Sequence, residues 1–190
     1  DAKSGTPPPA DWPATHDAGP LAATLNGGAL GSADVERPSI STGGSYTKEV
    51  TIGEGVEKLD VAIGGTSDAH ADLDLYVYKG SAEVGASTTA GSEEAVSLVK
   101  PAAGTYTVVV EGYDVPAGTT AYDYRDVYYS ASLGTISVDE SKAVNLAPGA
   151  SATVGAQVKV AGAAPEGRQF FGEVGLVNAR GTAAGTGSVV

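Results

Sequence analysis

The stretch DLDLYVY, residues 72–78, decides the fold of this chain. Its apolar residues alternate strictly with aspartate and tyrosine, which is the two-residue period of a β-strand and not the 3.6-residue period of a helix. We expect Leu73, Leu75 and Val77 to face a core and the other four side chains to face outward. The stretch therefore predicts a strand with one buried and one exposed face.

Four further runs share this alternation, and glycine or proline residues separate them. In the run at 104–112 (GTYTVVVEG), Tyr106, Val108 and Val110 fall on one face. Short strands divided by tight turns are typical of an antiparallel β-sandwich or jelly roll. We therefore expect an all-β fold, with a jelly-roll-like β-sandwich over residues 39–132. The runs lie at 56–63, 95–100, 104–112 and 122–131.

Residues 133–190 form a second block that alternates in the same way, and we expect it to fold as a smaller immunoglobulin- or fibronectin-III-like β-sandwich. The block is short for an immunoglobulin-like sandwich, which has roughly 100 residues. Two alternatives therefore stay open: a reduced sandwich, or one that borrows strands from the N-terminal segment. The runs of this block lie at 135–138, 144–146, 151–160, 170–177 and 188–190.

Residues 1–38 are interrupted by proline and glycine, and we predict an extended arm or linker there. Only residues 21–25 offer a short strand. Trp12, the single tryptophan, is expected to anchor the arm on a neighbouring sheet. The chain starts at Asp1 with no Met, basic segment or apolar leader, so we expect an internal piece of a longer precursor.

The composition excludes several classes of function. Of 190 residues, 23 are acidic and 11 are basic, which gives a net charge of −12. Such a surface repels phosphate backbones and anionic lipids, so we expect neither a nucleic-acid nor a membrane partner. It attracts cations, or it simply keeps a secreted protein soluble. The absence of cysteine excludes disulfides, a thiolate nucleophile and cysteine ligands for zinc.

No catalytic constellation is recognisable, so we predict no catalytic residue and no enzymatic activity for this segment. A serine-protease triad needs a nucleophile, a base within hydrogen-bond reach and a carboxylate that orients the base. The two histidines are His16, in the arm, and His70, in a loop, and neither has such neighbours in sequence. The tripeptide at 65–67 (GTS) echoes the start of a subtilase serine motif, but it lies between strands and we interpret it as coincidence.

Clustered carboxylates form a candidate metal site. Asp72 and Asp74 share the outward face of one strand, and Asp68 lies in the loop before it. Such acids repel one another unless water or a hard cation with six to eight oxygen ligands bridges them. We therefore name these three as candidate Ca²⁺ ligands, beside the alternative of solvated acids without a metal. Further contributors, if neighbouring strands bring them close, are Asp60, Asp123 and Asp126.

Tyrosines are concentrated between residues 76 and 129. An outward row of phenol rings beside acids suits the binding of an extended polypeptide or a sugar, because each ring offers an apolar face and a polar tip. The alternative is cross-strand aromatic packing that steadies a glycine-rich sheet. The candidate binding residues are Tyr76, Tyr78, Tyr122 and Tyr124.

The order of these motifs resembles the bacterial pre-peptidase C-terminal domain. The resemblance rests on DLDLYVY at 72–78, PAAGTYTVVVEGY at 101–113 and the YDY of 122–124, and it covers about half of the chain. It implies a jelly-roll-like β-sandwich of the kind found at the C-terminal side of secreted bacterial proteases. It also implies that Ca²⁺ is a plausible ligand, because some members of the family bind it.

The second block, with LAPGASATV at 146–154 and GEVGLV at 172–177, resembles the fibronectin-III-like tail of subtilases. Both resemblances imply a non-catalytic accessory region of a secreted, actinobacterial type of subtilisin-like serine protease, which assists substrate binding or stabilises the catalytic domain. The expected partners are that catalytic domain and a protein substrate. Two other interpretations stay open: a stand-alone extracellular module that binds carbohydrate or mediates adhesion, and a structural spacer.

Overall fold

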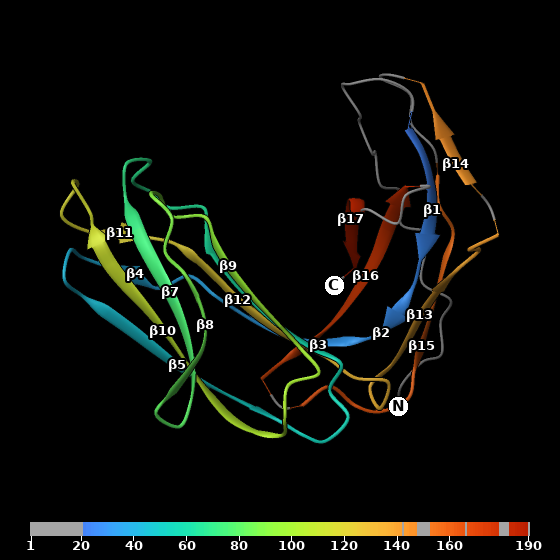
Figure 1. Ribbon diagram of the computed structural model, residues 1–190, viewed down its shortest axis with the longest axis horizontal. Coiled ribbons are helices and arrows are strands. Elements are labelled where there is room, and N and C mark those ends of the chain that lie inside the picture. Colours follow the sequence, from blue (N-terminus) through green and yellow to red (C-terminus); the bar gives the residue numbers. More distant parts are fainter. Residues whose placement is uncertain (1–20, 142, 148–152, 166, 179–182, 190) are drawn as a thin grey trace. The chain divides into compact units, whose positions relative to one another are not determined.

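Each expected run contains a strand in the computed structural model of the chain, although residues 151–152 and 190 of these runs lie outside the described residues and 153–155 are not in a strand (Figure 1). Every helix or strand assigned in the described ranges is a β-strand, which confirms the all-β fold. Within the same ranges, no helix is long and apolar enough to cross a membrane. The structure describes residues 21–141, 143–147, 153–165, 167–178 and 183–189.

The chain divides into two compact units. The chain changes unit after residue 31 and again after residue 130, whereas the boundaries predicted from sequence follow residues 38 and 132. A short segment at 167–169 also belongs to the larger unit, although it lies far along the chain, and no sequence pattern predicted this. Among the described residues, the larger unit consists of 32–130 and 167–169, and the smaller of 21–31, 131–141, 143–147, 153–165, 170–178 and 183–189.

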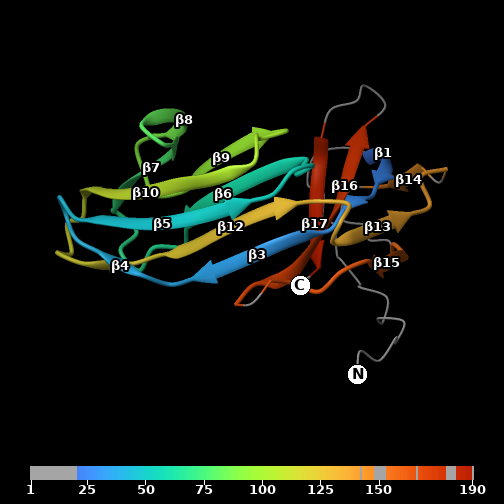
Figure 2. The same ribbon diagram turned by 90° about the horizontal axis from the view of Figure 1, so that it is seen from below.

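The larger unit is built from two antiparallel groups of four strands. In one group the strand order is β5-β10-β7-β8, and in the other β3, β12, β6 and β9 pair in that order. Figure 2 shows β3 beside β12 in the second group. The bounds of the first group are Ser45–Ile52, Gly104–Asp114, Asp72–Lys79 and Ala82–Ser87. Those of the second are Gly31–Glu36, Asp123–Tyr129, Lys58–Gly64 and Glu94–Val99. A ribbon of β4 (Ser39–Ile40) and β11 (Thr120–Ala121) completes the unit.

The core of the larger unit lies between these two groups of strands. Leu73, Leu75 and Val77 of β7 are fully buried, as the alternation of 72–78 predicts. In the antiparallel register Leu75 pairs with Val110 of β10, and both belong to one cluster of buried side chains. Burying an aliphatic side chain of this size stabilises a fold by about 1.5–3 kcal/mol, so strict alternation is enough to fix which face of the strand turns inward.

The smaller unit combines strands from both ends of the described chain. Strand β1 pairs with β14 and β16, β16 pairs with β17, and β13 lies between β2 and β15. The strands of this unit are β1 (Leu21–Asn26), β2 (Gly28–Ala29), β13 (Gly134–Val138), β14 (Ala143–Leu146), β15 (Ala156–Val160), β16 (Gln169–Asn178) and β17 (Ala183–Val189). Of the two alternatives left open, the unit therefore borrows strands from the N-terminal segment. The likeness to a fibronectin-III-like domain stays a prediction.

The interpretation of 1–38 as an arm is wrong for its C-terminal half, because β1, β2 and β3 pair within the two units. Close backbone approach explains the glycine that separates β1 from β2. A Cβ atom on Gly27 would lie 2.2 Å from the carbonyl oxygen of Ile136 on β13, so only glycine lets the two backbones meet. Trp12 and His16 lie outside the described residues.

Candidate functional site

Two tyrosines form the centre of an exposed face on the larger unit. Tyr76 and Tyr78 follow each other on the outward side of β7, with ring centroids 6.4 Å apart and an interplanar angle of 26°. On the neighbouring strand β10, Val109 lies opposite Tyr76, and Thr107 lies opposite Tyr78. Both rings are partly exposed, so they offer a small stacked aromatic surface on a rigid sheet. We call the outward side of β5-β10-β7-β8 the tyrosine face.

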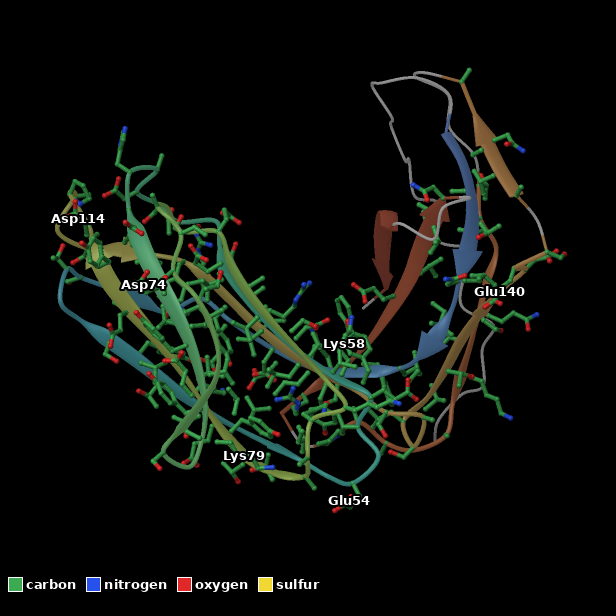
Figure 3. All side chains as sticks on the ribbon, viewed as in Figure 1. Glu54, Lys58, Asp74, Lys79, Asp114 and Glu140 are labelled. Carbon is green, nitrogen blue, oxygen red and sulfur yellow. The ribbon has the colours of Figure 1, made fainter. Side chains whose placement is uncertain are left out.

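Acidic side chains surround these rings. Asp74 precedes Tyr76 on β7 (labelled in Figure 3), and Glu111 lies opposite Asp74 on β10. Burial raises the pKa of Asp74, and the negative charges of Asp72 and Glu94 raise it further. A hydrogen bond from the Tyr76 hydroxyl at 3.3 Å acts in the opposite direction and lowers this pKa. Two further acids, Glu49 of β5 and Glu83 of β8, pair with Thr107 and Tyr78. The tyrosine face is therefore aromatic at its centre and acidic around it.

Tyr122 and Tyr124 were expected on an exposed row, and this prediction is wrong. Both side chains are fully buried in the core of the larger unit. Their rings contact Tyr46, with centroids 6.2 Å and 5.5 Å from it. In the alternation around β12 the aromatic rings occupy the inward positions and the exposed Asp123 occupies an outward one. For these two residues the aromatic-packing alternative holds.

Asp68, the first candidate Ca²⁺ ligand, joins two loops. Its Oδ2 accepts a hydrogen bond from the Ala117 amide at 2.9 Å, and its Oδ1 accepts one from the His70 amide at 3.0 Å. These backbone donors, Ala117 first, lower the pKa of Asp68 because they stabilise its charged form. A structural role for this carboxylate is thus visible without a metal.

The other acids of the proposed calcium site have different surroundings. Asp72 accepts a hydrogen bond from the Gly91 amide at 3.1 Å. The condition under which Asp60 would contribute is not met, because β6 pairs with β12 and β9 whereas β7 pairs with β10 and β8. Among the described residues, no three His, Cys, Asp or Glu side chains are grouped so as to hold a metal ion. Calcium at Asp68, Asp72 and Asp74 stays a prediction.

Two further acids that were considered as metal ligands each hold a basic side chain. Asp123 forms an exposed ion pair with Arg37, and Asp126 forms a buried one with Arg168. Arg168 also donates from Nε to the Ser32 hydroxyl at 2.8 Å, and its guanidinium carbon lies 5.0 Å from the centre of the Tyr128 ring. No local sequence pattern pointed to Arg168, because its partners lie far from it along the chain.

A surface pocket of about 350 Å³ lies beside Gly64 and Gly65 in the larger unit. Gly65 has a φ of +58°, and a Cβ atom on it would lie 2.4 Å from a carboxylate oxygen of Asp123. The amide of Gly65 donates to Glu93 at 2.8 Å, and Arg37 pairs with Asp123. Gly65, Glu93 and Asp123 of the pocket thus already have hydrogen-bond or ion-pair partners, which leaves the tyrosine face as the stronger candidate for binding.

The loop that contains His70 carries no arrangement of the kind a serine protease needs. The His70 side chain is 88% exposed, and its Nδ1 lies 3.8 Å from the Asp68 carboxylate. Ser67 belongs to the tripeptide at 65–67 that is similar to the start of a subtilase serine motif. Its hydroxyl lies 3.1 Å from the Thr120 hydroxyl and accepts a hydrogen bond from the Ala121 amide at 3.0 Å. Ser67 therefore connects this loop to β11.

Comparison with known proteins agrees with the resemblance found in the sequence. Residues 44–112 match the family model of the bacterial pre-peptidase C-terminal domain. Pyrolysin of Pyrococcus furiosus is 32% identical over 133 residues, which is 66% of this chain and 9% of pyrolysin. The chain thus spans less than a tenth of the length of that relative.

Solved structures resemble parts of the chain at low sequence identity. PliG of Aeromonas hydrophila, a periplasmic inhibitor of g-type lysozyme, is 16% identical with a TM-score of 0.38, over 51% of this chain and 86% of PliG. The mitogen derived from Yersinia pseudotuberculosis is 11% identical with a TM-score of 0.36, over 61% of this chain and 97% of the mitogen.

Proposed function

We propose that this chain is a non-catalytic accessory region of a secreted subtilisin-like serine protease, and that it holds protein substrate on the tyrosine face. The observation that carries this proposal is the pre-peptidase C-terminal domain at 44–112, together with the similarity to pyrolysin, a subtilisin-like protease. The partner within the parent protein is then the peptidase catalytic domain, and the site of action is outside the cell.

An accessory role also agrees with the chemistry of the described residues. Acyl transfer by a serine needs a base that is held against the hydroxyl and is oriented by a carboxylate. The exposed imidazole of His70 has a carboxylate 3.8 Å away, but the nearby Ser67 hydroxyl is bonded to β11. The peptidase activity would therefore come from the catalytic domain, with this region supplying substrate to it.

The tyrosine face suits an extended polypeptide. Tyr76 and Tyr78 stand on β7, whose opposite side is fixed by the buried Leu75 and Val77, so the rings lose little conformational freedom on binding. Tyrosine is one of the residue types that most often dominate the energy of protein interfaces, because it combines a large apolar ring with a hydroxyl. Side chains of a substrate can pack on the ring faces while the hydroxyls meet its backbone.

Retention on insoluble polymers tests this proposal. We expect the chain to be retained on collagen or elastin, and the double variant Tyr76→Ala/Tyr78→Ala to pass through. Val99→Ala is the control, because Val99 is 75% exposed on β9, in the other group of strands. Retention on chitin instead would favour the carbohydrate-binding alternative. Equal retention of the wild type and the tyrosine variant would contradict the proposed face.

A further inference from the structure

We propose that the polypeptide held by the tyrosine face is cationic, with two basic residues four positions apart. This inference rests on the proposed function and deepens it by naming a class of substrate. The carrying observation is the sign of the charges: every charged residue at an outward position of β5, β10, β7 and β8 is acidic. These residues are Glu49, Asp72, Asp74, Glu83, Glu111 and Asp114, the last of which lies opposite Asp72 after a register shift in β10.

The lysines of the same strands occupy inward positions by alternation. Lys48 lies two positions before the buried Val50 on β5 and therefore on the same, inward side of the strand. Its Nζ forms ion pairs with Asp34, at 2.7 Å, and with Glu36. Lys79 lies two positions after the buried Val77 on β7 and therefore on the inward side. Its Nζ donates hydrogen bonds to the backbone carbonyls of Ala102 and Ala103. The tyrosine face therefore carries acidic charge that no base on these four strands offsets from the same side.

This arrangement is unfavourable unless a cation approaches. Glu111 and Asp74 lie directly opposite each other on neighbouring strands, and like charges at such positions destabilise a sheet. The charges of Asp74 and Glu111 also contribute, after burial, to raising the pKa of Tyr76. Because Asp74 and Glu111 lie on adjacent strands, they are closer than one Debye length, roughly 8 Å at physiological salt, and their fields add at the surface. A basic polypeptide would relieve the repulsion.

One cross-strand row sets the spacing of the partner's charges. Glu49, Thr107, Tyr78 and Glu83 follow one another across β5, β10, β7 and β8. Neighbouring strands are about 4.8 Å apart, so the two glutamates at the ends of the row are separated by roughly 14 Å. An extended chain rises about 3.4 Å per residue, and four residues cover that distance with both side chains on one face. In the bound peptide, the residue midway between the two basic residues then faces Thr107 and Tyr78, which lie between the two glutamates.

Binding of short labelled peptides to the intact chain tests this inference. The probe is an extended ten-residue peptide with lysines at positions 3 and 7, and its comparison peptides carry glutamine or glutamate there. We expect the lysine peptide to bind about tenfold more tightly than the glutamine peptide, as two exposed ion pairs would give. The glutamate peptide should bind most weakly. The preference should shrink at about 1 M salt, where the Debye length is about 3 Å.

Charge-matched variants separate the tyrosine face from the overall charge of −12. Glu49→Gln/Glu83→Gln should abolish the preference for lysine. Glu54→Gln/Glu57→Gln removes the same charge in the β5–β6 connection (Glu54 is labelled in Figure 3) and should preserve it. Equal binding of all three peptides would overturn the charge inference and leave the proposed function standing. Equal losses in both variants would also overturn it, and no binding of any peptide would contradict the proposed function itself.

Discussion

The buried contact between Arg168 and Asp126 gives the sharpest prediction for stability. Asp126 is fully buried, and the guanidinium of Arg168 meets its carboxylate and the backbone carbonyl and hydroxyl of Ser32. Arg168→Met keeps much of the side-chain volume but leaves the carboxylate without its cation. Removing one partner of a buried ion pair costs about 3–5 kcal/mol, because the other charge remains desolvated. That loss is a large part of the roughly 5–15 kcal/mol that stabilises a typical domain.

The loss should depend on pH in a definite direction. Burial raises the pKa of Asp126, and Arg168 opposes that rise. In the variant the opposition is gone, so the pKa of Asp126 rises further. A carboxyl whose folded pKa lies above its unfolded value contributes stability below the unfolded pKa and loses it as the pH rises through the folded one. The deficit of Arg168→Met should therefore be largest at neutral pH and shrink toward about pH 4.

Urea unfolding followed by circular dichroism measures the effect as a change in midpoint at constant slope. Arg37→Met is the matched control, because the side chains of Arg37 and Asp123 are 51% and 63% exposed and such pairs are worth about 0–1 kcal/mol. The double variant Arg168→Met/Asp126→Asn should recover part of the loss, since the buried charge is then removed. If Arg168→Met costs no more than Arg37→Met, the account of this contact is refuted.

Other substitutions and additions test further parts of the structure. Gly27→Ala should lower the melting temperature of the smaller unit, because the new Cβ would lie 2.2 Å from the Ile136 carbonyl oxygen. Gly28→Ala is the control and should leave the melting temperature unchanged, because a Cβ there meets nothing within 4 Å. Leu75→Ala should cost about 2–5 kcal/mol in urea unfolding, as for other fully buried leucines, and a cost below 1 kcal/mol would contradict the described core. If calcium binds at Asp68, Asp72 and Asp74, EDTA should lower Tm and Asp72→Ala/Asp74→Ala should abolish that shift. An unchanged melting curve in EDTA would end the calcium proposal.

The strands with strict alternation could be predicted from sequence. Residues 73–77 and 106–110 place apolar or aromatic residues at every second position, and the structure buries those positions. Strand β5, Ser45–Ile52, was missed, because two of its inward positions hold Tyr46 and Lys48. Both side chains donate hydrogen bonds to Glu36, which lies on β3. These contacts join two strands, so a pattern within 45–52 alone does not reveal that polar groups can occupy inward positions there.

The candidate site was predictable in part, for a related reason. Alternation placed Tyr76 and Tyr78 outward because the leucines and valine beside them are more apolar. Around β12 the same rule favours burial of Tyr122 and Tyr124, since Asp123 is more polar than either ring, and the two are buried. Arg168 could not have been predicted, because its contacts join segments remote in sequence.

The most direct test of the central claim uses the full-length protein, which the proposed function identifies as a protease. We would measure hydrolysis of an insoluble protein and of a short chromogenic peptide, before and after Tyr76→Ala/Tyr78→Ala. A surface that only delivers substrate predicts a slower attack on the insoluble protein with an unchanged rate on the peptide. Unchanged rates on both substrates, or an equal fall in both, would contradict the claim.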